Sequence, residues 1–579
     1  MAKERNTSRF PNPLGQAWPE AWQKPLVRKE FSRALRRARK AFRSGKSQLA
    51  VEWCRYAASL AWGVNPGFFY SPEAEQLLAE IGRKYFGAGA TAEQPSSTPK
   101  RFLHLMTMAL PAGGHTRVVS RWIEICARCA PWEHHSIVIT FQEDQPIPAW
   151  LGQSAKKTGG ELVVLPSGLS WLQAAEEVRT RAMDFDAIVL HVHPNDPLPN
   201  LAFYDHPRPL LFFRHADHVF NLALDTAQAI AEIRFVGYEM SHRFLPRGSS
   251  KVIIPIPLID DEPDLCNKAE ARRKLGLPAD ASIVMTVGWP YKFISIIDCD
   301  FSQAVRALCE ANPRVYVVAV GPTESDLFPG LSQAVGGRYL PTGPINDRNL
   351  LELYYRSADV YVDAYPSGSL TATLDAARHA LPVQRLRNRH FCLFWSDDPA
   401  LDSVMLGAST QDEFIATVLE WLEWPEEKRL ELGSRFRTAV LRDHCGESWK
   451  SKWLDPAVSA LASSDDSTSD AETGNREWDE ARFPGLGVAG PERDWPAGMF
   501  VAGTIFTDEH FPRPIRISGV FHSIKPLFFH MSGEGTVQHR LTLLTWLIAS
   551  CVPYQIRSAP RRLCRSILKK LGYRPRSTR

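Results

Sequence analysis

From residue 101 onward, short runs of apolar residues alternate with stretches of helical periodicity, and this alternation limits the fold more than any other feature. Residues 135–141, HSIVITF, and residues 186–193, DAIVLHVH, are examples of these runs. Runs of this length, bounded by turn residues, are typical of buried strands. Strands that alternate with helices form parallel sheets with helices on both faces. The pattern therefore predicts an α/β protein.

The alternation occurs in two successive series, separated by a hinge-like segment that begins at residue 257 with PLIDDEPD. The first series covers residues 100–256 and the second covers 257–462, where a closing helix is expected after about residue 446. Each series is long enough for one doubly wound, Rossmann-like domain. Ligands of such domains bind at the carboxyl ends of the strands, so we expect the functional residues in the strand-end loops.

Three further segments flank these domains. Residues 1–95 contain helical patterns followed by a linker-like stretch, and they predict a helical N-terminal region. Residues 463–480 are acidic and poor in apolar residues, which predicts a disordered linker. Residues 481–579 are expected to form a partly disordered tail that contains an apolar and basic segment.

The net charge of +4 conceals a strong asymmetry. Residues 1–57 carry a net charge of +10 and residues 556–579 carry +9, so the intervening residues 58–555 carry −15. The C-terminal basic segment, with the apolar run before it, could lie on an anionic membrane surface, and a solvated tail is the alternative. Nucleic acid is not expected as a partner, because no RNA- or DNA-binding motif accompanies the charge.

The sequence predicts a cytoplasmic protein that is at most peripheral on the inner face of the cytoplasmic membrane. The longest apolar run, residues 541–552, is shorter than the roughly 20 residues that a spanning helix needs. The first residues lack the apolar stretch of a secretory signal. The 10 cysteines show no spacing typical of a disulfide framework, which favours a reducing compartment.

In the first series, a Gly-Gly pair follows a predicted strand and precedes a predicted helix. Gly113 and Gly114 would let the backbone approach a ligand closely, and the helix start would favour negative charge, although a plain turn is the alternative. His115 follows the pair directly. The loop after a later strand contributes His193 and Asp196.

A second group of candidates follows the strand at residues 210–215. His215, Asp217 and His218 occur within four residues of one another. An imidazole beside a carboxylate can act as a general base, because the carboxylate fixes the tautomer and raises the basicity of the ring. Solvated loop histidines are the alternative.

In the second series, two strand-end segments are suited to a diphosphate. Gly288 ends one strand, and Lys292 follows it with a side chain that can reach phosphate oxygens. Another strand leads into the turn at residues 367–371, SGSLT, before a helix that carries Asp375. Backbone N–H groups and hydroxyls at a helix start suit phosphates, and simple helix capping is the alternative.

Two patterns resemble metal sites, but both favour other interpretations. In residues 298–300, DCD, the second aspartate is placed to cap a helix. Cys126 and Cys129, near His134 and His135, lack a second cysteine pair and are typical of buried small side chains on a helix. We therefore expect no metal ion and no cofactor.

These segments, in this order, resemble GT-B glycosyltransferases of bacterial type, related to the O-GlcNAc transferase group and to the glycosyltransferase group 1 nucleotide-binding domain. The resemblance is clearest over residues 280–390, in VGWPYKF and in ADVYVDAYPSGSLTATLDAARHALPV. It implies that Lys292 contacts the diphosphate of the donor and that Asp375 holds the ribose. It also implies that Ser369 and Thr371 bind the phosphates, and we expect Gly288 and Leu370 to belong to the same donor-binding site.

The resemblance further implies transfer of a sugar from a nucleotide sugar, with a UDP-sugar favoured, to a glycan, lipid-linked or protein acceptor. Bacterial surface polysaccharide or glycoconjugate synthesis is the expected setting. The catalytic base would be one of His215, Asp217, His218 and His115. The resemblance also implies that Gly113 and Gly114 belong to an acceptor-side glycine loop. His193 and Asp196 would belong to an acceptor-side loop that faces the cleft between the domains. A sugar-nucleotide epimerase on the same scaffold and a non-catalytic assembly protein of this fold are the alternatives, and the stereochemical outcome is left open.

Overall fold

The computed structural model describes residues 20–63, 66, 68–87, 99–111, 114–142, 146–246, 248–260, 266–293, 295, 299–324, 328–387 and 395–462. The chain divides into two compact units, residues 68–493 and a second unit formed by residues 1–67 with 494–579. The predicted linker at 463–480 and the predicted tail at 481–579 lie outside the described residues.

The first domain is built on a seven-stranded sheet in the order β3-β2-β1-β4-β5-β6-β7, and every neighbouring pair is parallel. The strands are nearly continuous apolar runs, as expected for a sheet with helices on both faces. Their bounds are β1 Arg101–Met106, β2 His134–Ile139, β3 Leu162–Val164, β4 Ala187–His191, β5 Leu210–Arg214, β6 Ala229–Glu232 and β7 Ser250–Ile253.

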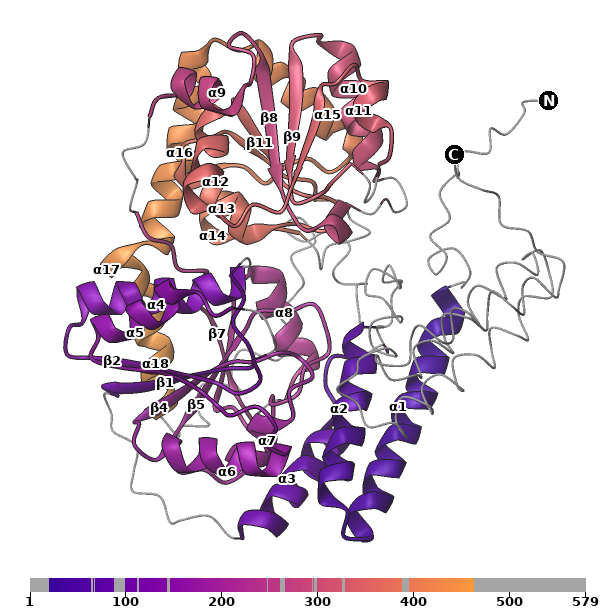
Figure 1. Cartoon of the computed structure of the whole chain (residues 1–579), viewed down its shortest axis with the longest axis vertical. Helices are drawn as coiled ribbons and strands as arrows, with labels where there is room; N and C mark the ends of the chain where they lie inside the picture. The colour runs from indigo at the N-terminus through magenta and orange to yellow at the C-terminus, as the bar shows by residue number, and fades with distance from the viewer. Residues whose placement is uncertain are drawn as a thin grey trace, which may run out of the picture. The chain divides into compact units, whose positions relative to one another are not determined.

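Helices connect these strands and cover the sheet (Figure 1). Because each parallel crossover returns the chain to the same end of the sheet, the loops after the strands collect at one edge. The helices are α4 Gly114–Cys129, α5 Ala149–Lys157, α6 Trp171–Ala182, α7 Leu198–Phe203 and α8 Phe235–Phe244.

The second domain repeats this plan with a five-stranded parallel sheet in the order β10-β9-β8-β11-β12. Its strands are β8 Ser282–Val287, β9 Val315–Val320, β10 Tyr339–Gly343, β11 Val360–Val362 and β12 Val383–Gln384. Its helices are α9 Lys268–Leu275, the 3₁₀ turn η1 Pro290–Phe293, α10 Phe301–Ala311, α11 Leu331–Ala334, α12 Arg348–Ser357, α13 Leu370–Arg378, α14 Pro399–Val404, α15 Gln411–Glu423 and α16 Glu426–His444.

These two sheets confirm the predicted fold class, an α/β chain with two Rossmann-like, doubly wound domains. In the part of the chain that the structure describes, no helix is both long enough and apolar enough to cross a membrane.

The closing helix predicted after residue 446 does form, but it packs on the first domain. It comprises α17 Gly446–Trp449, the π-helical turn η3 Lys450–Leu454 and α18 Asp455–Ala462. The indole Nε1 of Trp449 donates to the Pro255 carbonyl at 2.7 Å, and Lys450 pairs with Glu133 at 2.8 Å. The last helix also contacts β5, β6 and β7 (Figure 1). The chain therefore returns to its first sheet after completing the second domain.

The helical N-terminal region also differs from the expectation of one continuous region. Helices α1 Glu20–Arg43 and α2 Ser47–Gly63 pack on each other in one unit, whereas α3 Pro72–Phe86 belongs to the other unit and packs on α7. Helix α3 is held there by Glu75, whose buried carboxylate accepts hydrogen bonds from the backbone of Leu224 and Asp225 and from the side chain of Asn200. Burial raises the pKa of Glu75 to about 8.

Glu75→Ala should lower the free energy of unfolding by about 3 kcal/mol, because three buried donors lose their acceptor. Urea denaturation followed by circular dichroism would measure the change. Gln76→Ala is the matched control, since Gln76 is exposed on the same helix and its replacement should change the stability by less than about 0.5 kcal/mol. Equal stability of the two variants would contradict the anchoring role of Glu75.

Candidate functional site

Three of the predicted histidines meet at the carboxyl edge of the first sheet. His193 follows β4, His215 follows β5, and His115 lies in the first turn of α4. The rings of His115 and His215 are 4.0 Å apart between centroids, and those of His115 and His193 are 5.9 Å apart. His115 Nε2 donates to the carbonyl of His191 at 2.9 Å, which fixes its ring against the end of β4. The structure thus brings residues from three separate motifs into one cluster.

Asp196 lies beneath this cluster and holds the loop after β4 in place. Its carboxylate accepts from the Thr107 hydroxyl at 2.5 Å and from the Leu198 backbone at 2.9 Å, and Asp196 is buried. The Thr107 hydroxyl in turn accepts from the His193 backbone at 2.8 Å. These contacts favour a supporting role for Asp196 in positioning His193. Its predicted place among the acceptor-binding residues stays a prediction.

Asp217 is buried in an ion pair with Arg234, whose Nε and Nη2 donate to its two carboxylate oxygens at 2.7 and 2.5 Å. Burial alone would raise the pKa of Asp217, but the charge and hydrogen bonds of Arg234 and His218 hold that pKa well below its ordinary value. The carboxylate also lies 3.2 Å from Nδ1 of His218. These contacts favour Asp217 as the residue that orients His218, and its own part in catalysis stays a prediction.

In the second domain, the loop after β8 packs directly on the turn before α13. A Cβ atom at Gly288 would lie 2.9 Å from Ser369 Oγ and 3.1 Å from Ala364 Cβ, so a side chain at this position would separate the two segments. The ammonium group of Lys292 donates to the carbonyl of Gly368. Burial lowers the pKa of Lys292 to about 8, although the charge of Asp363 opposes the shift. Gly288 and Lys292 therefore lie against the turn that leads into α13.

Asp363, a residue that the sequence interpretation missed, builds the turn before α13. Its Oδ1 atom accepts from the Ser369 backbone and from the Thr373 hydroxyl, both at 2.8 Å. Asp363 directly follows β11 within the segment DVYVDAY, and this place at a strand end was the sequence signal that could have identified it. Ser369 Oγ is buried and has no hydrogen-bond partner among the described residues. Leu370 is the first residue of α13, so the helix start coincides with the predicted site.

The two domains touch where the predicted acceptor and donor segments face each other. A Cβ atom at Gly114 would lie 2.7 Å from Thr371 Oγ1, so only a glycine allows this approach without a shift. Further into the same two helices, Arg121 donates to Asp375 at 2.8 Å. Asp375, predicted to hold the ribose, is thus paired with an arginine that no local pattern singled out. Gly113, the other predicted glycine, lies outside the described residues.

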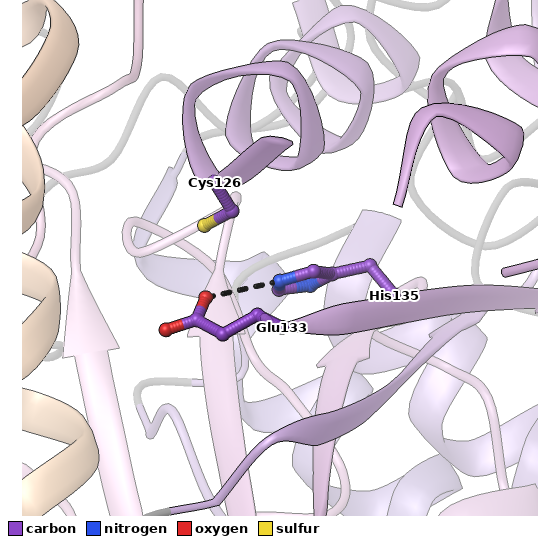
Figure 2. A group of neighbouring side chains, drawn as sticks. All are labelled: Cys126, Glu133 and His135. Carbon is purple, nitrogen blue, oxygen red and sulfur yellow. Dashed lines mark hydrogen bonds and ion pairs between the residues drawn. The ribbon is translucent and has the colours of Figure 1, made fainter. Parts of the chain in front are cut away.

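One group of potential metal ligands occurs among the described residues. Figure 2 shows Cys126 above Glu133 and His135. One potential ligand atom from each of these residues lies within 4.8 Å of the others. However, His135 bonds Glu133 through Nε2 and His104 through Nδ1, and Glu133 also pairs with Lys450. These bonds occupy both ring nitrogens and place an ammonium group where a cation would lie, so the residues do not fit a metal site.

The other pattern that resembled a metal site is a helix cap. Asp300 accepts from the backbone of Ser302 and Gln303 at 2.8 and 3.2 Å, and it thereby begins α10 as predicted. Asp298 lies outside the described residues.

No family model matches the chain, and no curated protein matches it. Solved structures do resemble it, and they include the glycosyltransferases that the sequence had suggested. HepE from Anabaena in complex with UDP and glucose is 14% identical with a TM-score of 0.48, and the match covers 62% of this chain and 100% of that one.

Two further structures are an O-GlcNAc transferase mutant from Thermobaculum terrenum and a glycosyltransferase from Rickettsia africae. The first is 14% identical with a TM-score of 0.46, over 76% of this chain and 84% of that one. The second is 12% identical with a TM-score of 0.45, over 62% and 99%. Because all these values are low, the fold assignment rests on the two sheets themselves, and the functional argument rests on the site.

Gly114→Ala should lower the free energy of unfolding by about 1–3 kcal/mol, because the new methyl group would press on Thr371. Thr371→Ala removes the nearest atom, so the double variant should recover part of the loss. Thermal unfolding of both single variants and the double variant would give their coupling energy. Gly248→Ala, with open space around its Cβ position, is the control. Purely additive effects would contradict the close approach of the two helices.

Proposed function

We propose that this protein is a glycosyltransferase that moves a sugar from a UDP-sugar to an acceptor hydroxyl. The observation that carries the proposal is the packing of the Lys292 loop on the turn before α13, at the carboxyl edge of the second sheet. This edge is where parallel α/β domains bind nucleotides. The helix that begins there touches the histidine-bearing edge of the first domain through Gly114.

The donor side can bind a diphosphate without a metal ion. The first N–H groups of α13 have no partner within the helix, and the positive end of the helix dipole favours an anion. Lys292 adds a partly buried positive charge, which is worth more in a site of low dielectric than in water. These local groups must supply the attraction, because residues 58–555 carry a net charge of −15. In this proposal they also stabilise the leaving nucleoside diphosphate.

On the acceptor side, His215 is the base that we propose. Burial holds the pKa of His215 well below its ordinary value, so the ring is neutral at pH 7 and can accept a proton. It is partly exposed at the strand edge, whereas His191 next to it is fully buried. His115 and His193 would shape the acceptor pocket around it, and His218 lies within the electrostatic influence of Lys292 on the donor side.

The acceptor in this proposal is a glycan, a lipid-linked saccharide or a protein, and the setting is bacterial surface polysaccharide or glycoconjugate synthesis. That part of the proposal rests on the sequence resemblance. With a lipid-linked acceptor, the basic C-terminal segment would hold the enzyme at the anionic inner face of the cytoplasmic membrane, where that acceptor lies.

Lys292→Ala should weaken UDP binding at pH 7 by at least about tenfold, because the diphosphate loses its positively charged partner. Isothermal titration calorimetry would measure the change. In the unaltered protein the affinity should fall as the pH rises through about 8, since the folded-state pKa of Lys292 is lowered to about 8 and the ammonium group then loses its proton.

Lys274→Ala is the matched control, because this exposed lysine lies on α9 of the same domain and pairs only with Glu270 in the described structure. It should bind UDP normally. Equal affinities of the Lys292 and Lys274 variants would rule out the donor site. A nucleotide-sugar panel with product analysis completes the test, because epimerised donor formed without an acceptor would indicate an epimerase instead of a transferase.

A further inference from the structure

A row of four histidines crosses the first sheet and ends in the candidate site. It begins at Glu133, whose Oε2 atom lies 3.2 Å from Nε2 of His135. His135 Nδ1 is 2.9 Å from Nε2 of His104, and His104 Nδ1 is 3.0 Å from Nε2 of His191. His191 Nδ1 is in turn 3.0 Å from Nε2 of His215. Each distance is that of a hydrogen bond.

The parallel register of the sheet creates this row. His104 on β1 pairs with Ile137, two residues beyond His135 on β2. His191 on β4 pairs with Met106, two residues beyond His104. Residues two apart point to the same face, so the side chains form a diagonal line on one face of the sheet. Trp122 of α4 covers this line, with its ring edge-on to His104 and His191 at 5.6 and 5.7 Å.

The row has a direction, and Glu133 sets it. An ionised carboxylate only accepts hydrogen bonds, so His135 must donate through Nε2 and accept through Nδ1. Because each bond needs one donor and one acceptor, Nε2 of His104 must donate to Nδ1 of His135. In the same way, Nε2 of His191 donates to Nδ1 of His104, and Nε2 of His215 donates to Nδ1 of His191. Every ring carries its proton on Nε2. The Nδ1 atom of His215 is left with a lone pair at the edge of the sheet.

The rings of His135, His104 and His191 are fully buried, and that of His215 is partly buried at the edge of the sheet. Burial lowers the pKa of His135, His104, His191 and His215, so a proton resting on an isolated ring would be unfavourable. At the far end of the row, the hydrogen bond and the charge of Glu133 favour the protonated form of His135. Burial raises the pKa of Glu133, but the hydrogen bonds from His135 and Lys450 outweigh it and keep the carboxylate ionised.

We propose that Glu133 and the four histidines form a proton relay, with Nδ1 of His215 as its receiving end. The proposal rests on the proposed function, in which His215 takes the proton of the acceptor hydroxyl as the new glycosidic bond forms. As Nδ1 of His215 gains that proton, its Nε2 proton passes to His191, and the Nε2 protons of His191 and His104 pass on in the same way.

These steps balance, since each ring in the middle gains one proton and loses one. The excess proton comes to rest on His135, which becomes an imidazolium ion beside the Glu133 carboxylate. The positive charge is thereby moved away from the reacting sugar, across three strands, to the Glu133 carboxylate. Return of the proton along the same bonds to His215, and from there to solvent, restores the starting state.

Several charged or titratable groups face the row and set its proton affinity. At the His215 end these groups are His115 of α4 and His193 of the loop after β4. At the Glu133 end they are Cys126 of α4, His134 of β2 and Lys450 of η3. Lys450 also pairs with Asp455 at 2.5 Å, so its charge is shared between two carboxylates.

Glu133→Gln tests the relay, because the amide keeps the shape of the side chain and removes the charge. The kcat of sugar transfer should fall by about tenfold or more, as for loss of general-base assistance. The acid limb of the pH profile of kcat/KM should also move to lower pH, because the row binds a proton less tightly without the carboxylate. A purely structural role would lower activity without moving this limb, and an unmoved limb would overturn the relay.

His104→Gln breaks the row in the middle while leaving the Glu133–His135 pair intact. Its effects should match those of Glu133→Gln, and the double variant should be no slower than His104→Gln alone, because both changes interrupt one path. Additive losses would contradict the relay. His206→Gln is the matched control, since His206 belongs to the same domain but its ring bonds the Arg179 carbonyl outside the row. Its pH profile should be unchanged.

A second measurement does not depend on the enzymatic activity. The ¹⁵N chemical shifts of histidine-labelled protein at pH 7 should show the four rings neutral and protonated on Nε2, with each signal assigned by its loss in the matching His→Gln variant. A ring of the row that is charged or protonated on Nδ1 would overturn the relay. Correct tautomers in a protein that turns over no nucleotide sugar would instead refute the proposed function alone.

Discussion

The parallel register of β2, β1, β4 and β5 is the constraint on which the candidate site depends. It brings the loops after β4 and β5 to one edge, and it also lines His135, His104 and His191 along one face of the sheet. Because side chains alternate between faces, a slip of one residue in any of these strands would turn its histidine away from the row. The same backbone pairing therefore builds the fold and connects a buried carboxylate to the site.

Buried polar contacts between the domains keep the two edges facing each other. Arg234 of the first domain bonds Asp217 and also donates to the carbonyl of Trp395 in the second. His444 at the end of α16 bonds both the Ile256 carbonyl, at 2.7 Å, and Asp398, at 3.1 Å. Separating the partners of such a buried pair would leave polar groups without compensation, so these contacts favour one relative placement of the two domains. Together with the return of α18 to the first sheet, they tie donor and acceptor sides into one unit.

Local sequence patterns predicted the fold class. They also selected the candidate site residues, because those residues follow strands, and the roles of these residues stay predictions. Gly288, Lys292 and the 367–371 turn come together as expected, and so do His115, His193 and His215. Parallel topology alone places strand ends at a common edge, so this part needed no long-range contact.

The remaining features depend on contacts between distant residues. The pairing of Arg121 with Asp375 spans two domains, and the docking of α3 depends on Glu75 meeting a loop near residue 224. His135 had been considered only as a metal ligand, because its neighbours in sequence gave no sign of His104 or His191. A diagonal row across strands has no periodic signature in one chain segment, so it becomes visible only when the register is known.

A crystal structure of the protein with UDP tests the central claim most directly. The account predicts that the diphosphate lies at the start of α13, within hydrogen-bond distance of the Lys292 ammonium group, on the side that faces His215. Binding of UDP at any other place, or an empty α13 start at saturating UDP, would contradict both the donor site and the role of His215 beside it.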